Sequence, residues 1–185
     1  MVSLVSTATL DLLCKCVAPV PASRVCRAIP LPPVARHQGA TVMAPPLAEI
    51  VALFDALGTV VPVETEAMMK KMMPITALMG QFYAQQRTAQ GWLQANGVEA
   101  EAAAKWVGAV YHTVSCDAAT PNEHTFEELV HEQTPGGLNE QIVREMTEAG
   151  AYAALTDSLD GALARIEGRT APQRTKRPYS SIEQE

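Results

Sequence analysis

The chain of 185 residues is poor in charged side chains, and its cations are not gathered into one patch. Only 18% of the residues are Asp, Glu, Lys or Arg, and the formal net charge is −6. The one basic run, Arg174 to Arg177, lies in a polar tail. A nucleic-acid groove needs clustered Lys and Arg to neutralise phosphates. We therefore expect no nucleic-acid partner.

A long hydrophobic run and a paired-cysteine motif are also missing. No stretch of about 20 apolar residues is present, so we expect no membrane span. The sequence has no Cys-x-x-Cys pair, the spacing typical of zinc and redox sites. Its four cysteines are Cys14, Cys16, Cys26 and Cys116. This irregular spacing indicates a reduced, cytoplasmic setting.

Hydrophobic residues make up 48% of the chain, and up to position 63 they form short runs separated by helical patterns. Strands are predicted at 2–5, 24–29, 39–43 and 60–63, and helices at 7–17 and 47–57. The proline-rich segment 29–35 is predicted to be an extended loop, because each proline fixes its own φ and restricts the preceding residue. Strands alternating with helices predict an α/β layer that is at least partly parallel.

From Glu64 onward the pattern is helical. Helices are predicted at 66–93, 100–115, 126–131, 138–149 and 152–166, with Gly80 and Gly91 as weak points of the first. Five methionines between positions 68 and 79 have helical spacing, which is typical of a core or a subunit contact. The fold class is therefore α/β followed by all-α, with parts at 1–63 and 64–168 and a disordered tail at 169–185.

A Pro-Gly-Gly turn interrupts the helical part between His131 and Gln141. Pro135, Gly136 and Gly137 do not fit inside a helix, so they are predicted to form a tight turn that opens a new one. The unpaired backbone N–H groups at such a helix start suit an anion or a carboxylate. The alternative is a plain connector between two helices.

A second polar constellation precedes this turn. His124, Glu128 and His131 fall at i, i+4 and i+7, so on one helix face they could hold Zn²⁺. The alternative is a solvated helix surface, and we expect no metal site. Cys116 is interpreted as a small apolar filler near a helix end.

Three motifs, in the right order, resemble the pyrroline-5-carboxylate reductase family, whose members make proline by reducing a cyclic imine with NAD(P)H. Arg27-Ala28-Ile29-Pro30-Leu31 resembles that family's Arg-x-Met-Pro-Asn loop. Residues 76–82, Thr-Ala-Leu-Met-Gly-Gln-Phe, resemble its Thr-Ala-Leu-Ser-Gly-Ser-Gly motif. Residues 133–139, Gln-Thr-Pro-Gly-Gly-Leu-Asn, resemble its Thr-Ser-Pro-Gly-Gly-Thr-Thr motif. The similarity runs from about residue 2 to residue 166.

The resemblance implies a fold, a partner and a set of site residues. Residues 1–63 would be the C-terminal part of a dinucleotide-binding, Rossmann-like domain, and 64–168 a helical domain that forms a homodimer. Thr134 and Thr76 would be catalytic, and NADP or NAD would contact Pro30, Leu31 and Pro32. The small-molecule substrate would bind Pro135, Gly136, Gly137 and Asn139. Together these residues would line one pocket.

The chain also departs from the family pattern. Leu138 offers only backbone groups where the family has a threonine, although Thr134 keeps a hydroxyl that can donate. The Gly-x-Gly-x-x-Gly turn that holds a dinucleotide pyrophosphate is absent from the 185 residues. We therefore expect the chain to begin near the fifth strand of such a domain, and this chain could lack a cofactor.

Three hypotheses for the function follow. The first is a diverged reductase that acts on a C=N bond and binds NAD(P)H in a complete form. The second is a non-catalytic dimerisation or interaction module derived from the same family. The third is a small acid-binding or zinc-binding helical protein.

Overall fold

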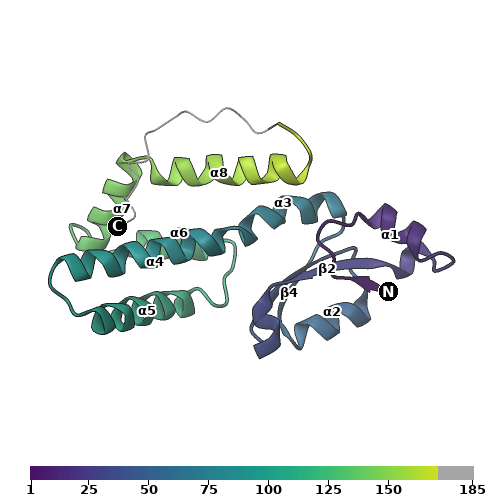
Figure 1. The fold of residues 1–185 in the computed structure, drawn as a ribbon, viewed down its shortest axis with the longest axis horizontal. Helices are drawn as coiled ribbons and strands as arrows, with labels where there is room; N and C mark the ends of the chain where they lie inside the picture. Colours follow the sequence, from purple (N-terminus) through teal and green to yellow (C-terminus); the bar gives the residue numbers. More distant parts are fainter. Residues whose placement is uncertain (171–185) are drawn as a thin grey trace. The chain divides into compact units, whose positions relative to one another are not determined.

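The computed structural model describes residues 1–170, which form two compact units (Figure 1). The first, here called the sheet unit, contains Met1–Thr76 together with the described residues from Leu159 onward. The second, here called the helical unit, contains Ala77–Ser158. Most of the predicted tail, residues 171–185, lies outside the described residues.

The sheet unit is built on four strands in the order β1-β2-β3-β4. β1 and β2 are parallel, β2 and β3 antiparallel, and β3 and β4 parallel. Its strands and α-helices are β1 (Val2–Ser3), α1 (Leu10–Cys16), β2 (Cys26–Pro30), β3 (Gly39–Ala44), α2 (Ala48–Asp55), β4 (Gly58–Pro62) and α3 (Glu66–Thr76). The predicted strand and helix order, and the partly parallel sheet, are confirmed.

Two short 3₁₀ helices, Ala22–Arg24 and Pro32–Arg36, complete the sheet unit. The second corrects the prediction of an extended loop at 29–35. Pro30 does end β2 in extended backbone, but Pro32 opens a helical turn. The fixed φ of proline suits the first position of a helix, where its missing N–H would have no intrahelical partner.

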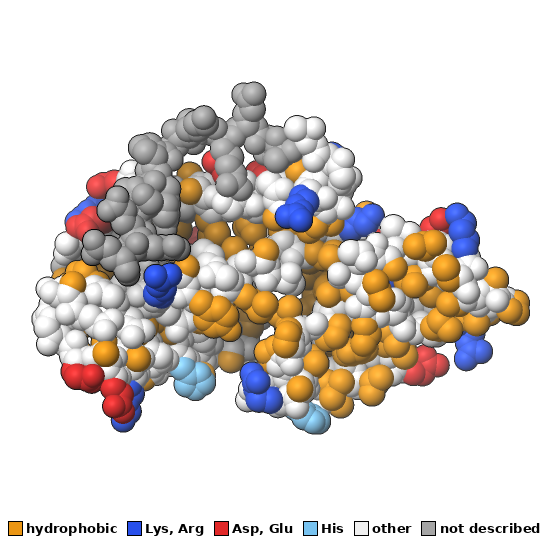
Figure 2. Space-filling view, in the orientation of Figure 1, with side chains coloured by type: hydrophobic (Ala, Val, Ile, Leu, Met, Phe, Trp, Pro, Cys, Tyr) orange, Lys and Arg blue, Asp and Glu red, His pale blue; other side chains and the backbone are white. Residues whose placement is uncertain are grey.

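Both faces of the sheet are covered, because successive side chains of a strand point to opposite sides. One face packs against α2 in a buried cluster formed by Cys26, Ala28, Met43 and Phe54. The other face packs against α3 in a buried cluster formed by Val42, Ala44 and Met69. Figure 2 shows that hydrophobic side chains also gather on the visible surface of the sheet unit. Among the exposed hydrophobic side chains of this unit are Leu53, at 52%, and Val61, at 38%.

The part after the sheet is helical, and residues 63–170 contain no strand. After α3 come α4 (Leu78–Ala95), α5 (Ala100–Asp117), α6 (Thr125–His131), α7 (Leu138–Glu148) and α8 (Ala151–Ile166). The prediction of α/β followed by all-α is confirmed. Over residues 1–170, no helix is both long enough and apolar enough to cross a membrane.

The long helix predicted at 66–93 is two helices, which corrects that prediction. The break falls between Thr76 and Leu78, not at Gly80 or Gly91, which both lie inside α4. Pro74 stands inside α3. Its ring removes one backbone hydrogen bond and clashes with the preceding turn, so the helix is weakened just before the break.

Candidate functional site

The sheet unit has two pairs of parallel strands, β1 with β2 and β3 with β4, and the two pairs run in opposite directions. Val2 pairs with Cys26 and Ser3 with Arg27, so β1 and β2 run in the same direction in register. The β1–α1 loop at residues 4–9 and the segment Pro30–Leu31–Pro32 therefore leave toward the same end of the sheet, although β1 ends opposite Arg27 and β2 continues for three more residues to Pro30. Ligands of α/β sheets bind outside the carboxyl ends of parallel strands. This carboxyl edge is the candidate site of the sheet unit.

Arg27, three residues before Pro30 in β2, fixes the backbone of the β1–α1 loop. Its side chain is buried, and Nη2 donates to the Ser6 carbonyl oxygen at 2.7 Å. Nη1 forms an ion pair with Glu66, whose Oε1 also accepts the Leu10 N–H at 2.9 Å. The network joins β2, the β1–α1 loop and the starts of α1 and α3. A buried charge needs such partners, because an unpaired one is costly.

Sequence reasoning missed the Arg27–Glu66 pair. The two residues are 39 positions apart, and neither stands in a sequence pattern that indicates the other as its partner. The one available signal was an arginine inside a run that is otherwise buried β-strand. A lone charge in such a run needs a partner, although the sequence does not say which one.

The segment Pro30–Leu31–Pro32 presents carbon rather than hydrogen-bond donors. Pro30 pairs with Thr41 in the β2–β3 ladder, and the Leu31 N–H donates to the Ala40 carbonyl at 2.9 Å. The two prolines have no N–H. The side chains of Pro30 and Leu31 are half-buried, and Pro32 is exposed. This segment can contact a flat apolar ligand, but it has no free backbone donor for phosphate.

Thr76, the last residue of α3, belongs to the same unit. Its hydroxyl donates to the Met73 carbonyl at 2.7 Å, so only its lone pairs remain for a ligand. The side chain is half-buried and stands one helical turn after Met72, which packs against the sheet.

The Pro-Gly-Gly turn lies in the helical unit and opens α7, as predicted. Gly136 has a φ of +74°, which favours glycine. At Gly137, a Cβ would lie 2.8 Å from the Thr134 carbonyl oxygen, so this position has no room for a side chain. The Gly137 N–H donates to that same oxygen at 2.9 Å. Both glycines are therefore required by the shape of the turn.

The polar groups of this turn are bonded to one another. The Gly136 N–H donates to Oε2 of Glu140 at 2.5 Å. Asn139 Nδ2 donates to Gln133 Oε1 at 2.7 Å, and Gln133 Nε2 donates to the Leu129 carbonyl at 2.6 Å. Thr134 and Pro135 are exposed. A carboxylate does bind the turn, as its chemistry suggests, but it is the chain's own Glu140.

The predicted site residues therefore fall into two groups. Pro30, Leu31, Pro32 and Thr76 belong to the sheet unit, whereas Thr134, Pro135, Gly136, Gly137 and Asn139 form one continuous turn of the helical unit. A shared pocket remains a proposal.

The zinc interpretation of the histidine face finds no support. His124 precedes α6, and its Nε2 lies 3.3 Å from Oε1 of Glu123. Within the part of the chain that the structure describes, no three His, Cys, Asp or Glu side chains are placed to hold a metal ion. The face is a solvated helix surface.

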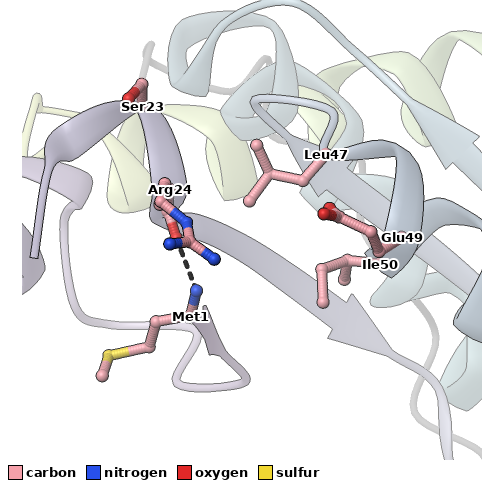
Figure 3. A pocket seen from close by; sticks show the side chains of 6 residues that line it. All are labelled: Met1, Ser23, Arg24, Leu47, Glu49 and Ile50. Carbon is pink, nitrogen blue, oxygen red and sulfur yellow. Dashed lines mark hydrogen bonds between the residues drawn. The ribbon is translucent and has the colours of Figure 1, made fainter.

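A shallow pocket of about 330 Å³ opens elsewhere on the sheet unit (Figure 3). It lies where β1 and β2 begin, opposite the carboxyl edge, and the Met1 nitrogen donates to the Arg24 carbonyl at 2.5 Å there. Its lining residues are Met1, Ser23, Arg24, Leu47, Glu49 and Ile50. None of the predicted site residues lines it.

Comparison with known proteins gives a clear likeness of fold. No family model and no curated protein matches the sequence. Among solved structures, a pyrroline-5-carboxylate reductase from Coxiella burnetii matches with a TM-score of 0.77 and 18% identity, covering 92% of this chain and 66% of that one. A Plasmodium falciparum pyrroline carboxylate reductase with NADP bound matches with a TM-score of 0.72 and 11% identity, covering 91% and 68%. The 1-pyrroline-5-carboxylate reductase of Streptococcus pyogenes matches with a TM-score of 0.73 and 15% identity, covering 90% and 66%.

The chain spans about two thirds of the length of these reductases. The match includes both the sheet unit and most of the helical part, because it covers at least 90% of this chain. The resemblance seen in the three sequence motifs is therefore confirmed at the level of fold. The chain has the fold of the corresponding two thirds of a pyrroline-5-carboxylate reductase.

Proposed function

We propose that the chain is a diverged, pyrroline-5-carboxylate reductase-like oxidoreductase that reduces a small imine or a related substrate with NAD(P)H. The observation that carries this proposal is the fold match, at TM-scores of 0.72–0.77 over at least 90% of the chain. One of the matching reductases was solved with NADP bound. Proteins of one fold can catalyse many different reactions, so the residues of the site must also suit the proposed reaction.

The carboxyl edge of the sheet unit fits the nicotinamide end of such a cofactor. Pro30 and Leu31 offer half-buried carbon surface, which suits a flat ring. The bound cofactor would supply the hydride. In this proposal Pro30, Leu31 and Pro32 orient the ring, and the Arg27–Glu66 pair, three residues earlier in β2, holds the neighbouring β1–α1 loop in place.

The two threonines supply the hydroxyl groups. Reduction of a C=N bond places a proton on nitrogen, so a hydroxyl near that nitrogen can donate to it. Thr134 is exposed at the turn and Thr76 has lone pairs left to accept. We propose Thr134 as the donor and Thr76 as the residue that positions the substrate, with Pro135, Gly136, Gly137 and Asn139 forming the wall of the site.

The test is NADPH consumption by the purified chain with a small cyclic imine. We expect imine-dependent consumption, with kcat lowered roughly 10²-fold in Thr134→Val, the size of a lost proton-transfer contribution. Thr147→Val is the matched control, because it removes a hydroxyl from α7 that bonds only to its own helix, at the Val143 carbonyl. Consumption that is independent of imine, or equal in the three proteins, would count against the proposal.

The helical unit also supports a proposal of homodimerisation. Its buried hydrophobic side chains are only Ala103 and Val107. Large apolar side chains remain exposed: Trp92 65%, Trp106 64%, Phe126 64%, Leu138 78% and Ile142 60%. A unit of this size needs a larger core, and such apolar surface marks interaction sites. We propose that a second copy covers it.

Sedimentation tests the dimer. We expect a mass of twice 19.8 kDa for the chain. Ile142→Glu on α7 should shift the protein toward monomer, because a charge cannot be buried unpaired at the interface. Gln141→Glu adds the same charge at the neighbouring exposed position and serves as the control. A stable monomer of the wild-type chain at micromolar concentration would argue against dimerisation.

The second candidate function is a non-catalytic dimerisation module of the same fold. The observation that favours it is the hydrogen bond from the Gly136 N–H to the Glu140 carboxylate, because the chain's own acid group then occupies the turn. The sequence also has Leu31, Phe82 and Leu138 where the family has asparagine, glycine and threonine. A stable dimer with no NADPH binding would favour this candidate.

A further inference from the structure

We infer that the pocket between the 3₁₀ helix Ala22–Arg24 and the start of α2 binds a zwitterion with an aliphatic side chain, of the size and chemistry of an aliphatic amino acid. None of the residues assigned to the proposed reduction lines this pocket. It is therefore a second site, separate from that reaction.

The pocket lies where one strand of a parallel pair ends. β3 runs parallel to β4 and ends at Ala44, and the chain then passes through two prolines to Leu47, which precedes α2. Ligands of α/β sheets bind outside the carboxyl ends of parallel strands. The volume of about 330 Å³ is near the lower end of the range for ligand pockets, roughly 300–1,000 Å³, so the pocket suits a small molecule.

Two side chains of opposite charge line the pocket. Arg24 and Glu49 are both exposed, and Figure 3 shows them on opposite sides of the space. The ion pairs among the described residues include neither the Arg24 guanidinium nor the Glu49 carboxylate. The Met1 nitrogen, which lies beside them, is bonded to the Arg24 backbone carbonyl and leaves the guanidinium free for a ligand.

These two charges together define the polar part of the ligand. A guanidinium binds a carboxylate through charge-assisted hydrogen bonds, and a carboxylate binds an ammonium group in the same way. A ligand with one charge would pair with Arg24 or with Glu49 and leave the other without a partner. A ligand that carries both a carboxylate and an ammonium group pairs with both.

The apolar part of the ligand follows from Leu47 and Ile50. Both side chains are half-buried and pack against the buried cluster on the α2 face of the sheet, so the core holds them in place. Their remaining surface lines the pocket. An aliphatic side chain placed against this surface is removed from water, which favours binding.

The test uses leucine and two analogues that each lack one of its charges. The first, 4-methylpentanoate, has no ammonium group, and the second, 3-methylbutylamine, has no carboxylate. Backbone NMR of the full chain would follow the amide signals of Ser23, Leu47 and Ile50 during titration. We expect leucine to shift these signals and to bind about fivefold more tightly than either analogue, which is the effect of one exposed ion pair.

Two variants assign the charges, and each has a matched control. Arg24→Gln should weaken leucine binding about fivefold and leave 3-methylbutylamine unchanged, because that amine has no carboxylate. Glu49→Gln should weaken leucine by a similar factor without weakening 4-methylpentanoate. The controls Arg36→Gln and Asp55→Asn remove the same charges from exposed positions of the sheet unit that do not line the pocket. Both controls should bind leucine as wild type does.

Three results would overturn the inference. The first is that leucine shifts none of the three amide signals at about 10 mM, ten times the Kd of a weak millimolar ligand. The second is equal binding of leucine by wild type, Arg24→Gln and Glu49→Gln. The third is tighter binding of either analogue than of leucine, which would assign the pocket to a singly charged ligand. Each result leaves the proposed reduction standing, because NADPH consumption is measured separately.

Discussion

At the scale of single residues, Arg27 is the side chain on which the carboxyl edge depends. It is buried in β2, pairs with Glu66 of α3 and holds the Ser6 carbonyl. Removing one partner of a buried pair leaves an uncompensated charge, and this loss exceeds the net contribution of the pair itself. The same contacts hold the β1–α1 loop beside β2, three residues before Pro30.

Arg27→Met should therefore lower the free energy of unfolding of the sheet unit by about 3 kcal/mol. Denaturant unfolding followed by circular dichroism measures it. The control is Asp11→Asn, which breaks the exposed Lys15–Asp11 pair and should change stability little, because exposed pairs are screened by water. Equal effects of the two substitutions would contradict the structural role of Arg27.

Cys26 gives a second prediction at this scale. It is fully buried in the α2-facing cluster, and burial raises the pKa of its thiol. Thiol reagents should label the exposed Cys16 and Cys116 in the folded chain and reach Cys26 only on unfolding. Mass spectrometry of labelled peptides checks this. Labelling of Cys26 at the rate of Cys116 would contradict the buried position.

The raised pKa also sets a pH dependence. The fold favours the protonated thiol, so this contribution to stability is fully present below the ordinary thiol pKa of about 8.5 and is lost as pH rises through the higher folded pKa. Unfolding free energies should thus decline in alkaline buffer, and Cys26→Ala should reduce the decline. An unchanged slope in that variant would assign the decline to other groups.

At the scale of elements, the β3–β4 pair depends on two glycines. Gly58 begins β4 with a φ of +137°, and a Cβ there would lie 2.1 Å from the Gly39 carbonyl oxygen. Gly58→Ala should therefore lower stability by about 2 kcal/mol or more, because the backbone conformation and the contact both exclude a side chain. Thermal unfolding measures the change.

The matched control lies inside α4. Gly91 has open space around its Cβ position, so Gly91→Ala should raise stability by about 0.5–1 kcal/mol through helix propensity. The two substitutions are chemically identical and should act in opposite directions. If both are neutral, the close approach of β3 and β4 at Gly39 and Gly58 is wrong.

The elements themselves were largely predictable from sequence. Apolar runs bounded by proline and glycine located all four strands. Thr9, a residue type favoured at helix starts, caps α1 by accepting the Leu12 N–H. The start of α7 followed from the Pro-Gly-Gly turn. These signals are local, because a cap, a turn or a period is set by residues within a few positions of one another.

What was missed depends on contacts that a local pattern does not contain. The Arg27–Glu66 pair joins two elements, and the break at Ala77 arises where Pro74 weakens the helix end. The bond from Gly136 to Glu140 is local, but it was missed because sequence reasoning placed an external anion at the turn. The third side chain after a helix start is a frequent partner of the turn's N–H groups, and that signal was available.

At the scale of the whole molecule, the fold match and the thin core of the helical unit lead to the same picture. A sheet unit with an ordered carboxyl edge and a helical unit with exposed apolar side chains together correspond to two thirds of a reductase. We propose that the first binds a nicotinamide ring and that the second binds a second copy of the chain. The proposed reductase and the proposed dimerisation module differ in whether the first of these surfaces is used.

The measurement that decides between them is a titration of the purified chain with NADPH, followed by the fluorescence of the nucleotide. The proposed reductase predicts saturable binding that NADP displaces and that Arg27→Met weakens, since that substitution removes the contacts that hold the β1–α1 loop beside β2, the strand that ends at Pro30. A linear response with no saturation, from a chain that still sediments as a dimer, would contradict the reductase and leave the dimerisation module.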